Sequence, residues 1–344
     1  MRLFFCCRIV FFYSNGGNMW KWLCAMLLGL SISLNAGDCC ITPSLYIGAE
    51  GLWWTVCQED LEFAVDLDAD SGEMLVGSGE THALEYDWCA GVRGFIGFDG
   101  YCGWDIRAVY TWYKNDTDET LTDLENLLIA SWAHPGGIGF NALSATATQN
   151  FRYQTADLIF GKELTFCPLA FTLAPFVGVR GLKINQDITA LYEGEDFGDN
   201  PQLITFESDL KAIGIYTGFH MRNNLCCGLG FYGDFAGSML YGQGKSRQNQ
   251  LSLNSSGAIV NTVVNLEENP SRILPGFHLR AGIDWLFEVA RMNFHIQAGY
   301  EFNHWFNTPI VSRFYDNVNH GVSSTSKKGE ITLHGAILSA ALRF

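Results

Sequence analysis

Residues 277–303, FHLRAGIDWLFEVARMNFHIQAGYEFN, decide the fold class of this chain. Apolar and polar residues alternate along both halves of the stretch, which places successive side chains on opposite faces of an extended strand. The short connection Ala290-Arg291 separates the two halves. The stretch therefore predicts two long antiparallel strands joined by a tight turn. The apolar face of its first half consists of Phe277, Leu279, Ala281, Ile283, Trp285, Phe287 and Val289.

The same alternation recurs along the rest of the chain in segments of roughly 13–16 residues. Strands of soluble sheets average about 5–6 residues, whereas a tilted membrane strand needs about 9–11. The segment at 206–221 fits least well, because Lys211, Ile213 and Ile215 share a face. The pattern predicts about ten strands, near residues 44–56, 85–98, 101–114, 151–163, 169–185, 206–221, 226–242, 273–289, 291–306 and 331–344.

Short and long connections alternate between these segments, as in an outer-membrane β-barrel with periplasmic turns and extracellular loops. The short connections are Asp99-Gly100, Ala290-Arg291 and residues 165–168 and 222–225. An even number of antiparallel strands would place both termini in the periplasm. We therefore predict an all-β, antiparallel transmembrane barrel as a single domain over residues 37–344. Its five long extracellular loops are expected at 57–84, 115–149, 187–205, 244–272 and 307–330.

Aromatic residues gather at the ends of the predicted strands, as expected where a barrel wall meets the two membrane–water interfaces. The predicted aromatic girdle contains Trp53, Trp54, Trp88, Trp104, Trp112, Trp285 and Trp305.

Composition narrows the function classes further. Charged residues make up 17% of the 344 residues, below the roughly 25% of an average soluble domain. The net charge of −15 argues against nucleic acid as a partner, because phosphate binding needs a basic face. No run of about 18 apolar residues follows residue 40, so helical membrane spans are not expected.

Both ends of the chain carry features of an exported outer-membrane protein. Residues 1–36 are predicted to be a signal peptide, with Lys21, an apolar run and a cleavage position near Ala36. Met19 alone would open a complete signal, so residues 1–18 are read as an alternative upstream start. The last predicted strand ends on Phe344, a terminal aromatic of the kind that the barrel assembly machinery recognises. The expected location is the bacterial outer membrane, in contact with lipid and lipopolysaccharide.

Five segments carry a family resemblance: YIGAEGLWW at 46–54, LEYDWCAGVRGFIGF at 84–98, APFVGVRGLKINQ at 174–186, GLGFYGDFAGSMLYG at 228–242 and IQAGYEFNHWFN at 296–307. They resemble the pore-forming major outer membrane proteins of Legionella and chlamydia-like bacteria. The resemblance spans nearly the whole mature chain and implies an abundant, porin-like envelope barrel, and it carries no set of functional residues to transfer.

The polar face of the predicted strands would line the interior, because Arg or Lys facing lipid near the midplane costs about 2–4 kcal/mol. Two alternatives stay open for a barrel of this size. The charged residues either pair across a plugged lumen or line a narrow pore, since eight strands leave room only for side chains. The predicted pore-lining residues are Asp87, Arg93, Asp105, Arg107, Asp157, Arg180, Asp234, His278, Arg280, Asp284 and Glu301.

Cysteines are frequent for an exported protein, and six of them map to the predicted periplasmic rim. The resemblance implies disulfide cross-links to other envelope proteins; intrachain bridges or small apolar side chains are the alternatives. No histidine lies near these cysteines at the spacing of a zinc site, so no metal or other cofactor is predicted. The candidate disulfide cysteines are Cys39, Cys40, Cys102, Cys167, Cys226 and Cys227.

Catalysis is a further possibility, since some ten-stranded barrels are outer-membrane proteases. His82, Asp87, His304 and His320 are the candidate acid–base residues, but their spacing forms no recognisable constellation. We therefore predict a non-enzymatic barrel. Its expected role is porin-like diffusion of small hydrophilic solutes together with a structural role in the envelope. The alternative is a non-conducting structural or adhesive barrel that acts through disulfide cross-links and its extracellular loops.

Overall fold

The computed structural model describes the chain from residue 43 onward, with internal gaps. The predicted signal peptide lies outside this part. The described residues are 43–67, 79–122, 128–134, 141–166, 171–194, 197, 199–289, 292–313 and 329–344.

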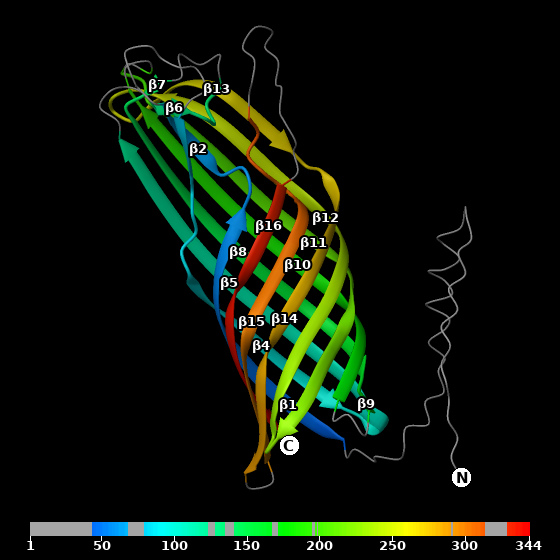
Figure 1. Ribbon diagram of the computed structural model, residues 1–344. Helices are drawn as coiled ribbons and strands as arrows, with labels where there is room; N and C mark the ends of the chain where they lie inside the picture. The colour runs from blue at the N-terminus through cyan, green and yellow to red at the C-terminus, as the bar shows by residue number, and fades with distance from the viewer. Residues whose placement is uncertain are drawn as a thin grey trace, which may run out of the picture. The chain divides into compact units, whose positions relative to one another are not determined.

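Ten long strands of the described residues close into one antiparallel barrel (Figure 1). Each pairs with the next long strand of the chain, and the first pairs with the last, from Tyr46 opposite Arg343 to Gln58 opposite Ile331. The all-β, ten-stranded prediction is confirmed. The barrel strands are β1 (Ser44–Gln58), β4 (Cys89–Asp99), β5 (Trp104–Thr122), β8 (Ser144–Lys162), β10 (Phe171–Glu193), β11 (Gln202–Cys226), β12 (Leu229–Leu253), β14 (Ser271–Val289), β15 (Met292–Thr308) and β16 (Gly329–Arg343).

The wall of the barrel changes character along its strands, as β10 illustrates. Near the short-turn end, Val177 and Val179 are exposed on the outside while Arg180 is buried inside. Farther along, the outward position is Lys183 and the buried inward position is Ile184. We call these parts the membrane section and the extension; on β10 they meet near residue 182. The extension has polar groups outside, as in a water-soluble barrel, and its interior combines apolar residues such as Ile184 with buried glutamines such as Gln186.

This reversal explains where the predicted strands were too short. β10 continues to Glu193 rather than ending near 185, and β12 continues to Leu253 rather than ending near 242. The prediction followed an apolar outer face, which ends where the extension begins. It also explains the weak pattern at 206–221, since Lys211 and Ile213 share the outer face of β11 on the two sides of that boundary.

Three of the regions predicted as polar loops contain strands, which corrects their description as loops. The four short strands from 57–84 and 115–149 form a second sheet, and β13 from 244–272 extends the barrel wall by pairing with β12 (Figure 1). We call this second sheet, together with Leu61 and residues 131–134, the lid. Its strands follow the order β3 (Gly79–Ala83), β2 (Glu62–Leu67), β6 (Leu128–Ala130) and β7 (Asn141–Ala142), and β13 spans Ile259–Glu268.

The opposite end of the barrel carries short connections. The 3-10 turn η2 (Tyr101–Gly103) joins β4 to β5, and β9 (Leu164–Phe166) pairs with the start of β10. Between β11 and β12 the chain turns at Cys227 and Gly228, both of which have positive φ. The turn predicted at 222–225 thus lies inside strand pairing. None of the described segments is a helix long and apolar enough to cross a membrane.

Candidate functional site in the barrel interior

The centre of the interior is organised around Glu301 of β15, whose side chain is completely buried. Arg93 of β4 donates from Nη2 and Nη1 to the two carboxylate oxygens, at 2.6 and 2.8 Å. Asn303 Nδ2 donates to Oε1 at 2.9 Å, and His278 Nε2 of β14 lies 3.0 Å from the same oxygen. A two-pronged contact of this kind fixes the orientation of both charged groups as well as attracting them.

Glu50 of β1 connects this pair to a second arginine. Arg93 Nη1 donates to Glu50 Oε2 at 2.7 Å, and Arg280 Nη1 donates to Oε1 at 2.9 Å. Arg280 Nε lies 3.7 Å from Asp234 Oδ2 on β12, and Asp234 in turn contacts His220 Nδ1 on β11. The charges thus alternate in sign across the lumen.

A third arginine joins the remaining strands. Arg180 of β10 donates from Nε and Nη2 to both oxygens of Asp157 on β8, each at 2.7 Å. Its guanidinium lies 3.5 Å from the ring centroid of Tyr216, whose hydroxyl is 2.9 Å from His278 Nδ1. Thr111 of β5 accepts from Arg93 Nε at 2.9 Å, so nine of the ten barrel strands contribute. We call this set the ionic layer: Glu50, Arg93, Thr111, Asp157, Arg180, Tyr216, His220, Asp234, His278, Arg280 and Glu301.

Further ion pairs occupy the interior toward the short turns. Asp284 is buried and accepts hydrogen bonds from Arg222 Nε and, at 2.9 Å, from His295 Nε2. Asp105 accepts from the Tyr46 hydroxyl at 2.5 Å, and Arg107 Nε lies 4.0 Å away. Charged groups in this part of the lumen therefore also meet partners.

An apolar layer fills the interior on the long-loop side of the ionic layer. Trp54 and Trp305 are buried there, and the rings of Tyr113 and Tyr153 lie 5.6 and 6.4 Å from the ring of Trp54. The Arg93 guanidinium lies 5.5 Å from the Trp54 ring centroid, so the two layers are in contact. We define the apolar layer by Leu52, Trp54, Tyr113, Tyr153, Leu182, Ile184, Leu240, Leu274, Trp305, Ile331 and Leu333.

The lid continues this apolar packing beyond the extension. Phe63 and Trp132 are buried, with ring centroids 6.3 Å apart, and the Tyr192 hydroxyl donates to the Phe63 carbonyl at 2.6 Å. Tyr86, in the segment between β3 and β4, packs edge-on against Phe151. Burial raises the pKa of Tyr86 well above its ordinary value, because the charged phenolate would lose its hydration there. Lid and apolar layer form one continuous hydrophobic core.

The structure places ten of the eleven predicted pore-lining residues in the interior. Asp87 is the exception, because it is exposed in the irregular segment that precedes β4 and is therefore not part of the wall. Pore lining itself stays a prediction. The buried members are Arg93, Asp157, Arg180, His278, Asp284 and Glu301, and the partly exposed ones are Asp105, Arg107, Asp234 and Arg280.

Several interior residues were missed by the sequence analysis. Glu50 is the most important of them, because it links Arg93 to Arg280. A signal for it existed: Glu50 alternates with the exposed Ile47 and lies on the face of Tyr46, which strict period two assigns to the interior. The other missed residues are His220, Tyr216, Arg222 and His295.

The predicted aromatic girdle needs two corrections. Trp54 and Trp305 are 0% and 2% exposed and belong to the apolar layer, not to the outer surface. Trp53 is next to Trp54 in a strand, so the two side chains have to face opposite sides of the wall. The remaining predicted members are exposed on the outside: Trp53, Trp88, Trp104, Trp112 and Trp285.

The cysteines within the described residues are free thiols. Cys102 lies in η2, and Cys226 and Cys227 lie at the β11–β12 turn, all three exposed. Cys57 and Cys89 lie at the long-loop end of the barrel, Cys57 near the end of β1 and Cys89 at the start of β4. The predicted candidates Cys39, Cys40 and Cys167 lie outside the described residues. Among those described, no group of three or more His, Cys, Asp or Glu side chains could hold a metal ion.

The candidate acid–base residues lie on separate elements. His82 is on β3, and His304 is on the outer face of β15, where Nδ1 is 2.8 Å from Thr332 Oγ1. His304 Nε2 lies 3.3 Å from Glu330 on the same face. Asp87 is in the exposed segment before β4, and His320 lies outside the described residues.

Comparison with known proteins gives one family match. The family model described as the Legionella pneumophila major outer membrane protein precursor matches residues 39–344. No curated protein sequence matches the chain. Among solved structures, the outer membrane protease OmpT of Escherichia coli is similar at 11% identity and a TM-score of 0.44, covering 88% of this chain and 96% of that one.

Two further structures are more distant. The Pseudomonas putida toluene transporter TodX is similar at 8% identity and a TM-score of 0.28, with 87% and 89% of the two chains covered. A FadL homologue of Pseudomonas aeruginosa is similar at 7% identity and a TM-score of 0.24, with 88% and 90% covered. None of these likenesses bears on the activity of this chain.

Proposed function

The chain belongs to the Legionella major outer membrane protein family, and from this premise we propose that it is a structural barrel whose lumen is closed at rest. It is an outer-membrane protein with a β-barrel fold. In this proposal it supports the envelope through its outer wall, its thiols and its folded long-loop end. It does not act as an open conduit.

The observation that carries the proposal is the complete burial of charged side chains in mid-lumen. Glu301 is 0% exposed, and Arg93 reaches across to both Glu301 and Glu50. In a water-filled channel such groups would be exposed to solvent, and their charges would need no protein partner. Here each charge meets an opposite charge, which is the condition under which ions are tolerated in a dry interior.

Porin-like diffusion is the competing function. It requires a continuous water path, and barrels of about 16–18 strands provide one whereas those of about eight are filled by side chains. The apolar layer and the lid add two further obstacles on the long-loop side, with Trp54 and Phe63 at 0% exposure. These features support the non-conducting alternative over the porin prediction.

We further propose the usual orientation, with short turns in the periplasm and the long-loop end outside the cell. The hairpin of β12 and β13 then faces the exterior. Ile259 and Val260, which follow its turn, are 62% and 60% exposed. Exposed apolar side chains on an ordered hairpin suit contact with a partner molecule.

Solute uptake tests the closed lumen. Liposomes that contain the refolded protein should swell in arabinose no faster than protein-free liposomes, because both interior layers block the path. Liposomes with an equal amount of a general porin serve as the positive control. Swelling at a rate comparable to that porin would support the diffusion function and contradict ours.

The structural role through thiols has its own test. We expect the triple variant Cys102→Ser/Cys226→Ser/Cys227→Ser to lose most disulfide-linked multimers on non-reducing gels of alkylated envelopes, since two exposed thiols can be oxidised to a disulfide in the oxidising periplasm. The matched control is Cys89→Ser, which replaces a half-buried cysteine near Asn115. This variant should still form the multimers. An unchanged ladder in the triple variant would rule out cross-linking through these turns.

A further inference from the structure

Five consecutive barrel strands change from apolar to basic at the same boundary of their outer face. On β11, Ile215 and Ile213 are each 62% exposed, and the next outward residue is Lys211. On β10 the exposed Val179 precedes Lys183. β5, β8 and β12 behave alike, each with exposed apolar or aromatic residues before a cation. We call the resulting set the basic belt: Lys114, Arg152, Lys183, Lys211 and Lys245.

Like charges face each other directly within this belt. Lys183 of β10 is the register partner of Lys211 on β11, and Lys114 of β5 is the partner of Arg152 on β8. Directly opposed like charges on neighbouring strands are destabilising. In a chain of net charge −15, with few cations overall, two such pairs side by side indicate a surface made to meet an anion.

The acidic groups beside the belt neutralise it only in part. Lys211 Nζ lies 3.0 Å from Asp209, and Lys114 contacts Asp116. Both contacts are exposed, and exposed ion pairs of this kind are weak and readily exchanged. The lysines can therefore turn to an external anionic group.

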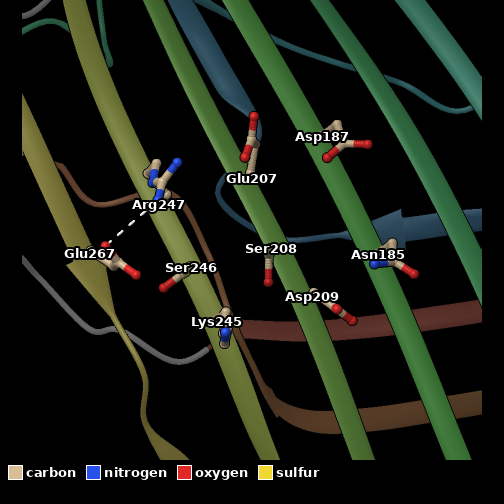
Figure 2. Close-up of a pocket in the computed structure, with 9 residues that line it drawn as sticks. All are labelled: Asn185, Asp187, Glu207, Ser208, Asp209, Lys245, Ser246, Arg247 and Glu267. Atoms are coloured by element: carbon tan, nitrogen blue, oxygen red, sulfur yellow. Dashed lines mark ion pairs between the residues drawn. The ribbon is translucent and has the colours of Figure 1, made fainter.

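A polar pocket of about 300 Å³ adjoins the belt on the long-loop side (Figure 2). Lys245 belongs to both, and Figure 2 shows the other lining residues on the neighbouring strands, among them four carboxylates. These are Asp187, Glu207, Asp209 and Glu267, and they lie beside Asn185 and Arg247. Amide, carboxylate and hydroxyl groups suit the hydroxyls of a sugar. The wall thus offers, in sequence, an apolar surface for acyl chains, a cationic row for phosphate and a polar hollow for sugar.

We propose that the basic belt binds the phosphate groups of a glycolipid of the outer leaflet, of the lipid A type. The acyl chains lie along the exposed face near Val179 and Ile213, the phosphates contact Lys183 and Lys211, and the sugars extend toward the pocket. The inference rests on the orientation proposed above, because only the long-loop end meets the outer leaflet. It is independent of whether the lumen conducts.

Native mass spectrometry of the refolded full chain in detergent tests the proposal, with diphosphoryl lipid A, dephosphorylated lipid A and phosphatidylglycerol as probes. Loss of a charge-assisted phosphate contact should weaken diphosphoryl lipid A binding roughly tenfold in Lys183→Gln and on the order of a hundredfold in Lys183→Gln/Lys211→Gln. The matched control is Lys162→Gln, which removes a cation near the Trp104 ring at the short-turn end. It should bind like the unmodified protein.

Dephosphorylated lipid A and phosphatidylglycerol should each bind at least about tenfold more weakly than diphosphoryl lipid A. Equal binding of dephosphorylated lipid A, or unchanged affinity in the double variant, would overturn the phosphate contact. Equal binding of phosphatidylglycerol would overturn the glycolipid assignment. Heat-modifiable gel mobility confirms that each variant is folded before it is measured.

Discussion

Glu301→Gln is expected to lower the free energy of unfolding by about 3–5 kcal/mol, the cost of removing one partner from a buried ion pair. The substitution keeps the shape of the side chain but removes its charge. Arg93 then keeps only Glu50 as an ion-pair partner, and Glu50 also pairs with Arg280. His278 loses the carboxylate 3.0 Å from its Nε2. The excess positive charge remains inside the barrel, away from water.

Urea unfolding in detergent, followed by tryptophan fluorescence and by heat-modifiable gel mobility, measures this loss. Glu59→Gln is the control, because Glu59 is exposed just after β1 and its loss should change the free energy of unfolding by less than about 0.5 kcal/mol. The double variant Arg93→Met/Glu301→Leu should lose less stability than the sum of its single variants, since it removes both charges. A Glu301→Gln midpoint equal to that of Glu59→Gln would show that the ionic layer does not stabilise the barrel.

Period two in the sequence was enough to predict the ten strands and most of the interior. Arg93, Arg180 and Glu301 could be assigned to the inner face because each alternates with apolar residues that face lipid. The same rule, applied strictly, would also have placed Glu50 and Trp54 inside. The girdle prediction for Trp54 rests on aromatic character at a strand end, whereas its position next to the exposed Trp53 places its side chain inside.

Other features depend on contacts that alternation does not encode. The pairing of Arg180 with Asp157 follows a cross-strand register, but the meeting of Arg93 with Glu301 joins residues 208 positions apart across the lumen. The lid strands are short, and their burial depends on Phe63 and Trp132 packing against the mouth of the extension. Beyond the lipid boundary the apolar face of the strands moves from outside to inside. The alternation with an apolar outer face, which predicts membrane strands, therefore ends at this boundary.

The extension shows how one strand serves two solvents. On β10 the outward positions run from Val179 through Lys183 to Asp187, while the inward positions run from Arg180 to Ile184. The wall is apolar outside where it meets lipid and polar outside where it meets water, with the interior complementary in each part. A barrel built in this way has a hydrophobic core above the membrane section, and our proposal is that this core closes the lumen.

The largest functional effect is expected in ion conductance, which is all or none for a closed lumen. Electrical recording of the refolded protein in a planar bilayer, with folding shown by heat-modifiable mobility, tests this directly. Because Glu301, Arg93 and Trp54 are packed inside the barrel, we expect no channel currents at protein amounts that give abundant channels for a general porin. Discrete, reproducible conductance steps from the folded protein would show an open water path and contradict the closed barrel.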